Sequence, residues 1–211
     1  MFLSIALSSL NQNIEVFQGV MMTERRAIPM KDPGDYIEPD EAERILSIIA
    51  DPQDKLIIGL LWRCGLRAFE VGKIKKKHLS LSDGALIIEG KGNTILRIPV
   101  EPELLEWLRV QSQDLNPDDY IISLQNNKGI SRVSVWRRVE KYSKEAGVLV
   151  TKANKPMHPH AFRHSIAIFL VRQGVPIPKI QQLLRHSSLE ATTYYLQFSA
   201  KELAEDYLLA W

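Results

Sequence analysis

The chain contains 211 residues, of which 45% are apolar and 25% are charged. This composition is typical of a folded globular domain and excludes an intrinsically disordered chain. No apolar run approaches the roughly 18 residues that a membrane-spanning helix needs. The single cysteine, Cys64, excludes an internal disulfide framework and a multi-cysteine zinc site, and it fits a reducing, cytoplasmic location.

Charged residues are distributed unevenly, although the net charge is only +2. Between Glu145 and Glu190 there is no acidic residue, whereas this stretch holds six lysines and arginines and four of the five histidines. A second stretch, residues 63–77, has six basic side chains and one acidic side chain, Glu70. Such stretches indicate a face that binds a polyanion. Chance clustering of basic residues on solvated helix faces is the alternative.

The N-terminal part of the sequence has little periodic pattern, so we expect residues 1–36 to form a loosely structured extension and residues 37–211 to form one domain. The first helix is predicted to begin at Pro39, because proline suits the first helical position. Asp40 and Glu41 follow, and their charges favour the positive end of the helix dipole.

Further helices are predicted where apolar residues recur at helical spacing and a glycine or proline marks an end. In chain order they cover about residues 54–64, 68–74, 102–113, 132–146, 159–173, 176–185, 189–197 and 200–210. Between Ala85 and Val100 the pattern becomes strand-like, and the glycines beside Lys91 predict an antiparallel hairpin. The sequence therefore predicts an α+β fold that is mostly helical with a small antiparallel sheet.

Two local patterns place a cation where it could meet an anion. In the run from Gly65 to Glu70, the carboxylate lies three residues after Arg67 and can hold the guanidinium from the same helical turn. Lys91 lies between two glycines at the predicted hairpin tip, where it can reach into a cleft. Each pattern also has an ordinary interpretation, since arginine often follows a helix-ending glycine and turn lysines are usually just solvated.

A third pattern contains His160 and Arg163, which share one helix face in a segment without negative charge. A phosphate suits that face, because arginine offers forked donors and histidine offers a donor or a proton acceptor. His160 and His164 also have zinc-ligand spacing, but no glutamate lies between them and no cysteine lies nearby.

A fourth pattern is the run from Leu183 to Ser188, which contains His186 and is followed by Tyr194 and Tyr195. Paired tyrosines on a helix are more often core and surface aromatics than nucleophiles. Taken in order, however, the four patterns resemble the catalytic domain of the tyrosine recombinase (phage integrase) family. That family has Gly-Leu-Arg-x-x-Glu, a hairpin lysine, His-x-x-Arg and Leu-Leu-Gly-His-Ser, and then a nucleophilic tyrosine.

The resemblance covers about residues 37–211 and identifies candidate site residues. The matching positions are Arg67, Lys91, His160, Arg163, His186 and Tyr195, with Glu70 in support. Tyr195 lies nine residues after His186, which is the position of the family's nucleophile. Tyr194 falls where the family usually has an apolar core residue, and Arg185 stands where the family usually has glycine.

The resemblance implies an enzyme that breaks and rejoins double-stranded DNA. Tyr195 would attack a phosphodiester to form a 3′-phosphotyrosine, which conserves the bond energy. Arg67 and Arg163 would hold the non-bridging oxygens in place of metal ions, so neither a cofactor nor a metal is implied. His160 and His186 would add donors or move the tyrosine proton, and Lys91 would protonate the leaving 5′ oxygen.

The resemblance also implies assembly into a homotetramer on DNA, and the apolar stripe in the helix predicted at residues 200–210 suits exchange between protomers. That helix could equally fold onto its own core. The first 36 residues are too few for the family's usual core-binding domain, so we expect either a fragment or a short, catalytic-domain-only recombinase. Two other functions stay open: a non-cleaving DNA-binding regulator or recombination accessory with the same fold, and a zinc-dependent hydrolase.

Overall fold

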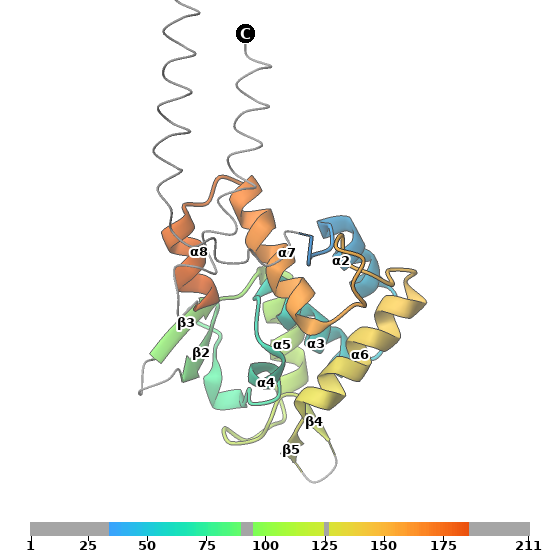
Figure 1. Ribbon diagram of the computed structural model, residues 1–211. Coiled ribbons are helices and arrows are strands. Elements are labelled where there is room, and N and C mark those ends of the chain that lie inside the picture. The colour runs from blue at the N-terminus through green and yellow to red at the C-terminus, as the bar shows by residue number, and fades with distance from the viewer. Residues whose placement is uncertain (1–33, 90–94, 125–126, 186–211) are drawn as a thin grey trace, which may run out of the picture. The chain divides into compact units, whose positions relative to one another are not determined.

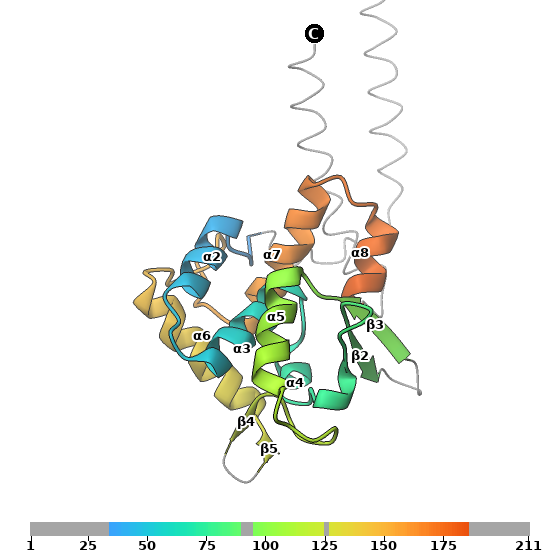
Figure 2. The same cartoon turned by 180° about the vertical axis from the view of Figure 1, so that it is seen from behind.

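The computed structural model describes residues 34–89, 95–124 and 127–185, and it is drawn from two sides in Figures 1 and 2. The helices are α2 (Pro39–Ser47), α3 (Pro52–Arg63), α4 (Ala68–Val71), α5 (Pro102–Ser112), α6 (Arg132–Glu145), α7 (Pro159–Arg172) and α8 (Ile177–Leu184), with a 3₁₀ turn η1 (Lys76–His78). The strands are β1 (Leu79–Ser80), β2 (Ala85–Glu89), β3 (Ile95–Pro99), β4 (Ser123–Leu124) and β5 (Lys128–Gly129). The predicted α+β class, mostly helical with a small antiparallel sheet, is confirmed.

The main sheet is antiparallel, with the strand order β1-β2-β3. Strands β2 and β3 form the predicted hairpin, in which Ala85 lies opposite Pro99 and Glu89 lies opposite Ile95. The tip of this hairpin, with Lys91, lies outside the described residues. The structure adds β1 and a second antiparallel pair, β4 and β5, that the sequence did not predict. Each of these strands has two residues, which is too short for an alternating pattern to show.

Local signals set the helix boundaries close to where the sequence predicted them. Proline occupies the first helical position of α2, α3, α5 and α7. At the start of α3, the carboxylate of Asp51 accepts a hydrogen bond from the backbone N–H of Asp54 at 2.8 Å. Helix α4 ends at Val71, earlier than the predicted residue 74, because the chain turns at Gly72. The helices predicted at residues 189–197 and 200–210 lie outside the described residues.

Helix α3 is the centre of the core. Every residue from Leu56 to Trp62 is buried, because α3 packs against α2, α4, α5, α6 and α7. A helix that is apolar on nearly all sides is stable only when neighbours surround it. The end of α3, and the turn that follows it, are therefore fixed relative to the other helices.

Helix α7 is buried along most of its length and carries α8 beside it (Figure 1). Phe162 is fully buried in this layer, and α8 contributes Ile180 and Leu184 to the core. The segment before α2 is tied to the same layer, since the backbone N–H of Ile37 donates to Ser165 Oγ at 2.9 Å. In the described part of the chain, no helix has the length and apolar character needed to cross a membrane.

Candidate active site

The turn between α3 and α4 brings three distant parts of the chain together at Gly65. This residue has a φ of 60°, in the left-handed region that favours glycine. A Cβ atom here would lie 2.6 Å from Cδ2 of Leu184, so α8 packs directly against the turn. The carbonyl oxygen of Gly65 accepts a hydrogen bond from Nη1 of Arg163 at 2.5 Å, which attaches α7 to the same turn.

Glu70 is the acceptor around which this corner is organised. Its carboxylate accepts the backbone N–H of Arg67 at 2.8 Å and Nη1 of the Arg67 side chain at 3.1 Å. It also accepts Nη2 of Arg185 at 2.6 Å. The Glu70 side chain is only 9% exposed, and a buried carboxylate requires such charged partners. The Arg67–Glu70 pair that the sequence spacing predicts is present.

Arg163 and His160 lie in the first turns of α7 and differ in exposure. Arg163 is only 3% exposed, whereas His160 lies on the exposed surface one turn earlier. The first turn of α7 itself has no acidic residue. The carboxylate of Asp35 bonds His158, the residue directly before the helix.

Arg185 follows the last residue of α8, and its side chain is 7% exposed. Its carbonyl oxygen accepts Nη2 of Arg67 at 3.1 Å, so Arg67 is bound on one side by Glu70 and on the other by Arg185. Burial lowers the pKa of Arg185 below its usual value despite the nearby Glu70 carboxylate, and the charge of Arg67 acts in the same direction as burial.

Within the described residues, this corner holds three guanidinium groups: those of Arg67 and Arg185 bond the Glu70 carboxylate, and that of Arg163 bonds the carbonyl of Gly65 in the same turn. The excess of positive charge suits an anion. Guanidinium groups present planar, forked donors that match the oxygen atoms of a phosphate. The Arg67 side chain is 28% exposed, compared with 7% for that of Arg185.

Lys91, His186 and Tyr195 lie outside the described residues, so their roles stay predictions. Arg185 was noted in the sequence only as a departure from the family pattern, and its burial in the site was missed. The available signal was its position directly after a helix, followed at once by a candidate catalytic histidine.

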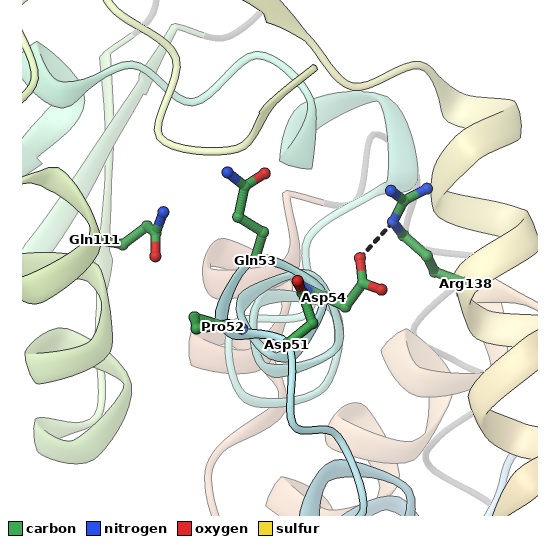
Figure 3. Close-up of a pocket in the computed structure, with 6 residues that line it drawn as sticks. All are labelled: Asp51, Pro52, Gln53, Asp54, Gln111 and Arg138. Carbon is green, nitrogen blue, oxygen red and sulfur yellow. Dashed lines mark hydrogen bonds and ion pairs between the residues drawn. The ribbon is translucent and has the colours of Figure 1, made fainter. Parts of the chain in front are cut away.

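A pocket of about 320 Å³ opens elsewhere, at the start of α3 (Figure 3). It is lined by Asp51, Pro52, Gln53, Asp54, Gln111 and Arg138, and it includes none of the predicted site residues. Asp54 is already bound by Nε of Arg138 at 2.5 Å and by the hydroxyl of Tyr142 at 2.8 Å, so we interpret these contacts as structural. Within the described ranges, no group of three or more histidine, cysteine or acidic side chains is placed to hold a metal ion.

Comparison with known sequences gives a consistent result. The model of the phage integrase family matches residues 35–202. The chain is 34% identical over 184 residues to "Tyrosine recombinase XerA" of Pyrococcus horikoshii, a match that covers 84% of this chain and 61% of that protein. It is also 34% identical over 182 residues to a "Tyrosine recombinase" of Pseudothermotoga lettingae, covering 84% of this chain and 59% of that protein. The chain thus spans about three fifths of the length of these curated relatives.

Comparison with solved structures shows the same fold. The chain superposes with a TM-score of 0.71 on the XerH site-specific recombinase bound to a palindromic difH substrate in a post-cleavage complex. The two sequences are 22% identical, and the match covers 87% of this chain and 55% of that one. At this identity the likeness concerns the fold.

Proposed function

The chain belongs to the phage integrase family, and from this premise we propose that it is a site-specific recombinase that breaks and rejoins double-stranded DNA through a 3′-phosphotyrosyl intermediate. The observation that carries the proposal is that Arg67, bonded to Glu70, and Arg163, bonded to the carbonyl of Gly65, are held at the same turn between α3 and α4. Cleaving a phosphodiester by transesterification places negative charge on the phosphorus oxygens, and preorganised guanidinium groups stabilise that charge.

The reaction divides between a nucleophile, a charge-stabilising group and an acid. The phenolic oxygen of Tyr195 forms a bond to phosphorus while the bond from phosphorus to the 5′ oxygen breaks. Arg67 and Arg163 hold the two non-bridging oxygens. Lys91 gives its proton to the leaving 5′ oxygen, and His160 and His186 hydrogen-bond the phosphate or accept the tyrosine proton.

Preorganisation of the arginines follows from contacts that the fold supplies. Arg163 is held by the carbonyl of Gly65, and Arg67 is held by Glu70 and by the carbonyl of Arg185. Donors fixed in this way do not have to reorganise as charge develops, which is the main source of electrostatic catalysis. These arginines supply the charge that metal ions supply at other phosphoryl-transfer sites, so the reaction as proposed uses neither a metal nor a cofactor.

The proposal extends to organisation and partners. Residues 37–211 form the catalytic domain and residues 1–36 form an extension before it. The protein acts on double-stranded DNA in the cytoplasm and assembles as a homotetramer, because strand exchange between two duplexes requires the cleavage of four strands.

Covalent trapping tests the proposed function. The full chain is incubated with a library of nicked duplexes of randomised sequence, because a nick next to the cleavage site lets the leaving strand diffuse away and traps the adduct. We expect the wild type to form a protein–DNA complex that survives SDS. Tyr195→Phe should bind DNA without forming the adduct, and Tyr194→Phe is the matched control that should still form it.

Other outcomes decide between the alternatives. Loss of the adduct in Tyr194→Phe alone would place the nucleophile one residue earlier. Specific DNA binding by the wild type without any adduct would identify a non-cleaving regulator. Loss of activity with EDTA that is restored by zinc would favour the hydrolase.

A further inference from the structure

The backbone of Arg185 adopts a conformation that its residue type disfavours. Its φ and ψ angles are 53° and 46°, in the left-handed region where a Cβ atom is crowded by the backbone. Glycine is the common residue at such a position after a helix. A strained residue persists only when the surrounding structure holds it there, and such residues cluster at functional sites.

The contacts of Arg185 reach Arg67 by two routes. The Arg185 side chain donates to Oε2 of Glu70 at 2.6 Å, while the other oxygen of that carboxylate accepts Nη1 of Arg67 at 3.1 Å. The Arg185 carbonyl accepts Nη2 of Arg67, also at 3.1 Å. Both hydrogen-bond acceptors that orient the Arg67 guanidinium therefore depend on Arg185: one belongs to it, and the other is the carboxylate that it holds.

The burial of the Arg185 guanidinium is costly for the folded protein. Nε and Nη1 of Arg185 are buried and have no hydrogen-bond partner among the described residues. Its buried guanidinium also lies beside the like charge of Arg67, with a single carboxylate between them. Buried donors without partners and a surplus of buried positive charge both oppose folding. The cost of burying the Arg185 guanidinium therefore indicates that this side chain has a role in the site.

We propose that Arg185 is a positioning residue of the recombinase site, which fixes the orientation of Arg67 through Glu70 and so presents Arg67 to the scissile phosphate. This inference rests on the proposed function. Arg185 itself is too deeply buried to be the group that first meets DNA, whereas Arg67 is 28% exposed. The Arg185 side chain bonds one oxygen of the Glu70 carboxylate, and the other oxygen bonds the Arg67 guanidinium.

The substitution Arg185→Gly isolates the side chain, because glycine keeps the left-handed backbone and with it the carbonyl acceptor. Single-turnover cleavage is measured on the nicked duplex recovered from the library. We expect the cleavage rate constant to fall about 10- to 100-fold, because a displacement of about 1 Å can cost about 10² in rate, while the DNA concentration for half-saturation is unchanged. Arg172→Ala is the matched control, because Arg172 lies at the C-terminal end of α7 and pairs with Glu38 at 2.6 Å. This variant should cleave at the wild-type rate.

A double-mutant cycle identifies the route of the effect. If Arg185 acts through Arg67, then Arg185→Gly should cause no further loss in an Arg67→Ala background. In an Arg163→Ala background it should still cause the full loss. Equal losses in both backgrounds would overturn the positioning role and indicate direct contact with the phosphate or a general structural defect.

Chemical rescue supplies a second readout. Millimolar guanidinium chloride should restore cleavage by Arg185→Gly, with sodium chloride at equal ionic strength as the control because DNA binding depends on salt. Arg185→Lys should be only partly active, since lysine keeps the charge but lacks the fork. If Arg185→Gly does not fold, as judged by thermal melting, Arg185→Asn also tolerates the left-handed conformation and should show the same loss.

The outcomes separate this inference from the function on which it rests. A wild type that forms no adduct with any duplex of the library contradicts the proposed recombinase activity. A wild type that cleaves, together with an Arg185→Gly variant that cleaves equally fast, overturns the positioning role alone.

Discussion

The guanidinium of Arg67 is held at both of its terminal nitrogen atoms, by Glu70 at 3.1 Å and by the carbonyl of Arg185 at 3.1 Å. The Arg67 side chain is nevertheless 28% exposed. Arg163 bonds the carbonyl of Gly65 and is almost fully buried. The two arginines thus differ in exposure, although the proposed reaction gives both of them the task of holding a non-bridging oxygen.

Lys91 is predicted to be the general acid for the leaving 5′ oxygen, and its substitution tests that role. If it protonates the leaving 5′ oxygen, Lys91→Ala should cleave ordinary DNA slowly, by about 10² to 10⁴-fold. The same variant should recover on a duplex with sulfur at the 5′-bridging position, because a thiolate leaves without protonation. Rates on the two substrates, measured under single-turnover conditions, check this expectation.

The control for Lys91 is Lys128→Ala, which removes an exposed lysine from the β4–β5 hairpin. This variant should cleave both substrates at the wild-type rate. Equal damage to Lys91→Ala on the oxygen and sulfur substrates would mean that Lys91 binds phosphate without transferring a proton.

At the residue scale, the sequence predicted contacts between near neighbours and missed those between distant ones. The Arg67–Glu70 pair follows from a spacing of three residues, so it could be predicted. The contact of Arg185 with Glu70 joins residues 115 positions apart, and no periodicity encodes such a pairing. The positive φ of Arg185 could not be predicted either, because arginine rarely adopts the left-handed conformation.

At the scale of elements, the turn at Gly65 couples three helices, and Gly65→Ala tests this coupling. The left-handed φ costs an alanine about 1 to 2 kcal/mol, and its Cβ would lie 2.6 Å from Leu184 Cδ2. We expect the free energy of unfolding, measured with urea, to fall by more than the backbone penalty alone. DNA cleavage should fall as well, because α8 and the Gly65 carbonyl must shift.

Gly147→Ala is the matched control for this prediction. Gly147 has a φ of 71°, yet nothing lies within 4 Å of the position of its Cβ. It therefore reports the backbone penalty without the clash, and it should leave cleavage unchanged. Equal destabilisation by the two substitutions would show that Leu184 adapts easily and that the turn is not tightly coupled to α8.

The segment before α2 is attached to the start of α7 by a contact that should make the free energy of unfolding depend on pH. Asp35 bonds His158, the residue before α7, with a distance of 2.9 Å between Oδ1 and Nε2. Burial raises the pKa of Asp35, but the hydrogen bond and charge of His158, together with the charge of Lys155, outweigh burial and lower the pKa overall. A carboxyl whose pKa is lower in the folded state stabilises the fold above its unfolded-state pKa of about 3.9.

Asp35→Asn should therefore lower the free energy of unfolding near neutral pH by about 1 kcal/mol. The difference from the wild type should shrink as the pH falls below about 4 and through the folded-state pKa of Asp35, because the wild-type carboxyl is then protonated as well. Urea unfolding across this pH range measures the effect, with the exposed Asp114→Asn as the control. A difference that stays constant to the lowest pH would contradict the assignment.

The elements themselves could be predicted where they are long and marked at their ends. Helix α7, which begins at Pro159 and is followed by Gly174, and α6, which is followed by Gly147, were placed within a few residues. Two-residue strands such as β1 and β4 could not be predicted, because they depend on partners that are distant in sequence or on turn geometry. Helix α4 was predicted too long, since the apolar pattern continues past the turn at Gly72.

At the scale of the whole molecule, the two basic stretches contribute unequally to the predicted anion-binding face. Arg67 and Arg163 meet at the Gly65 corner, although they come from different stretches. Other cations of the first stretch are already paired: Arg63 bonds Glu43, Glu101 and Glu103, while Lys75 and Lys77 approach Asp118. Counting charges along the sequence therefore overestimates the charge available to DNA, because the partners come from elements that only the fold brings near.

We expect assembly on DNA to depend on the last part of the sequence, which lies outside the described residues. Leu203, Tyr207, Leu208 and Trp211 recur at helical spacing and form an apolar stripe. Such a stripe must be buried, either on its own domain or on a neighbouring protomer. We expect exchange with a neighbour, since recombination requires that protomers act together.

Removal of the residues after Ser199 tests this expectation while leaving Tyr195 in the chain. The truncated protein should still form the covalent adduct on a single nicked duplex, because cleavage there needs one protomer. It should bind DNA without cooperativity and form no tetramer on paired sites, as measured by gel shift and by light scattering.

Thermal melting separates the two explanations for the stripe. A helix that packs on its own domain would lower the melting temperature sharply when it is removed, whereas an exchanged helix leaves the isolated domain nearly as stable as before. Tetramers formed by the truncated protein would show that another surface joins the protomers.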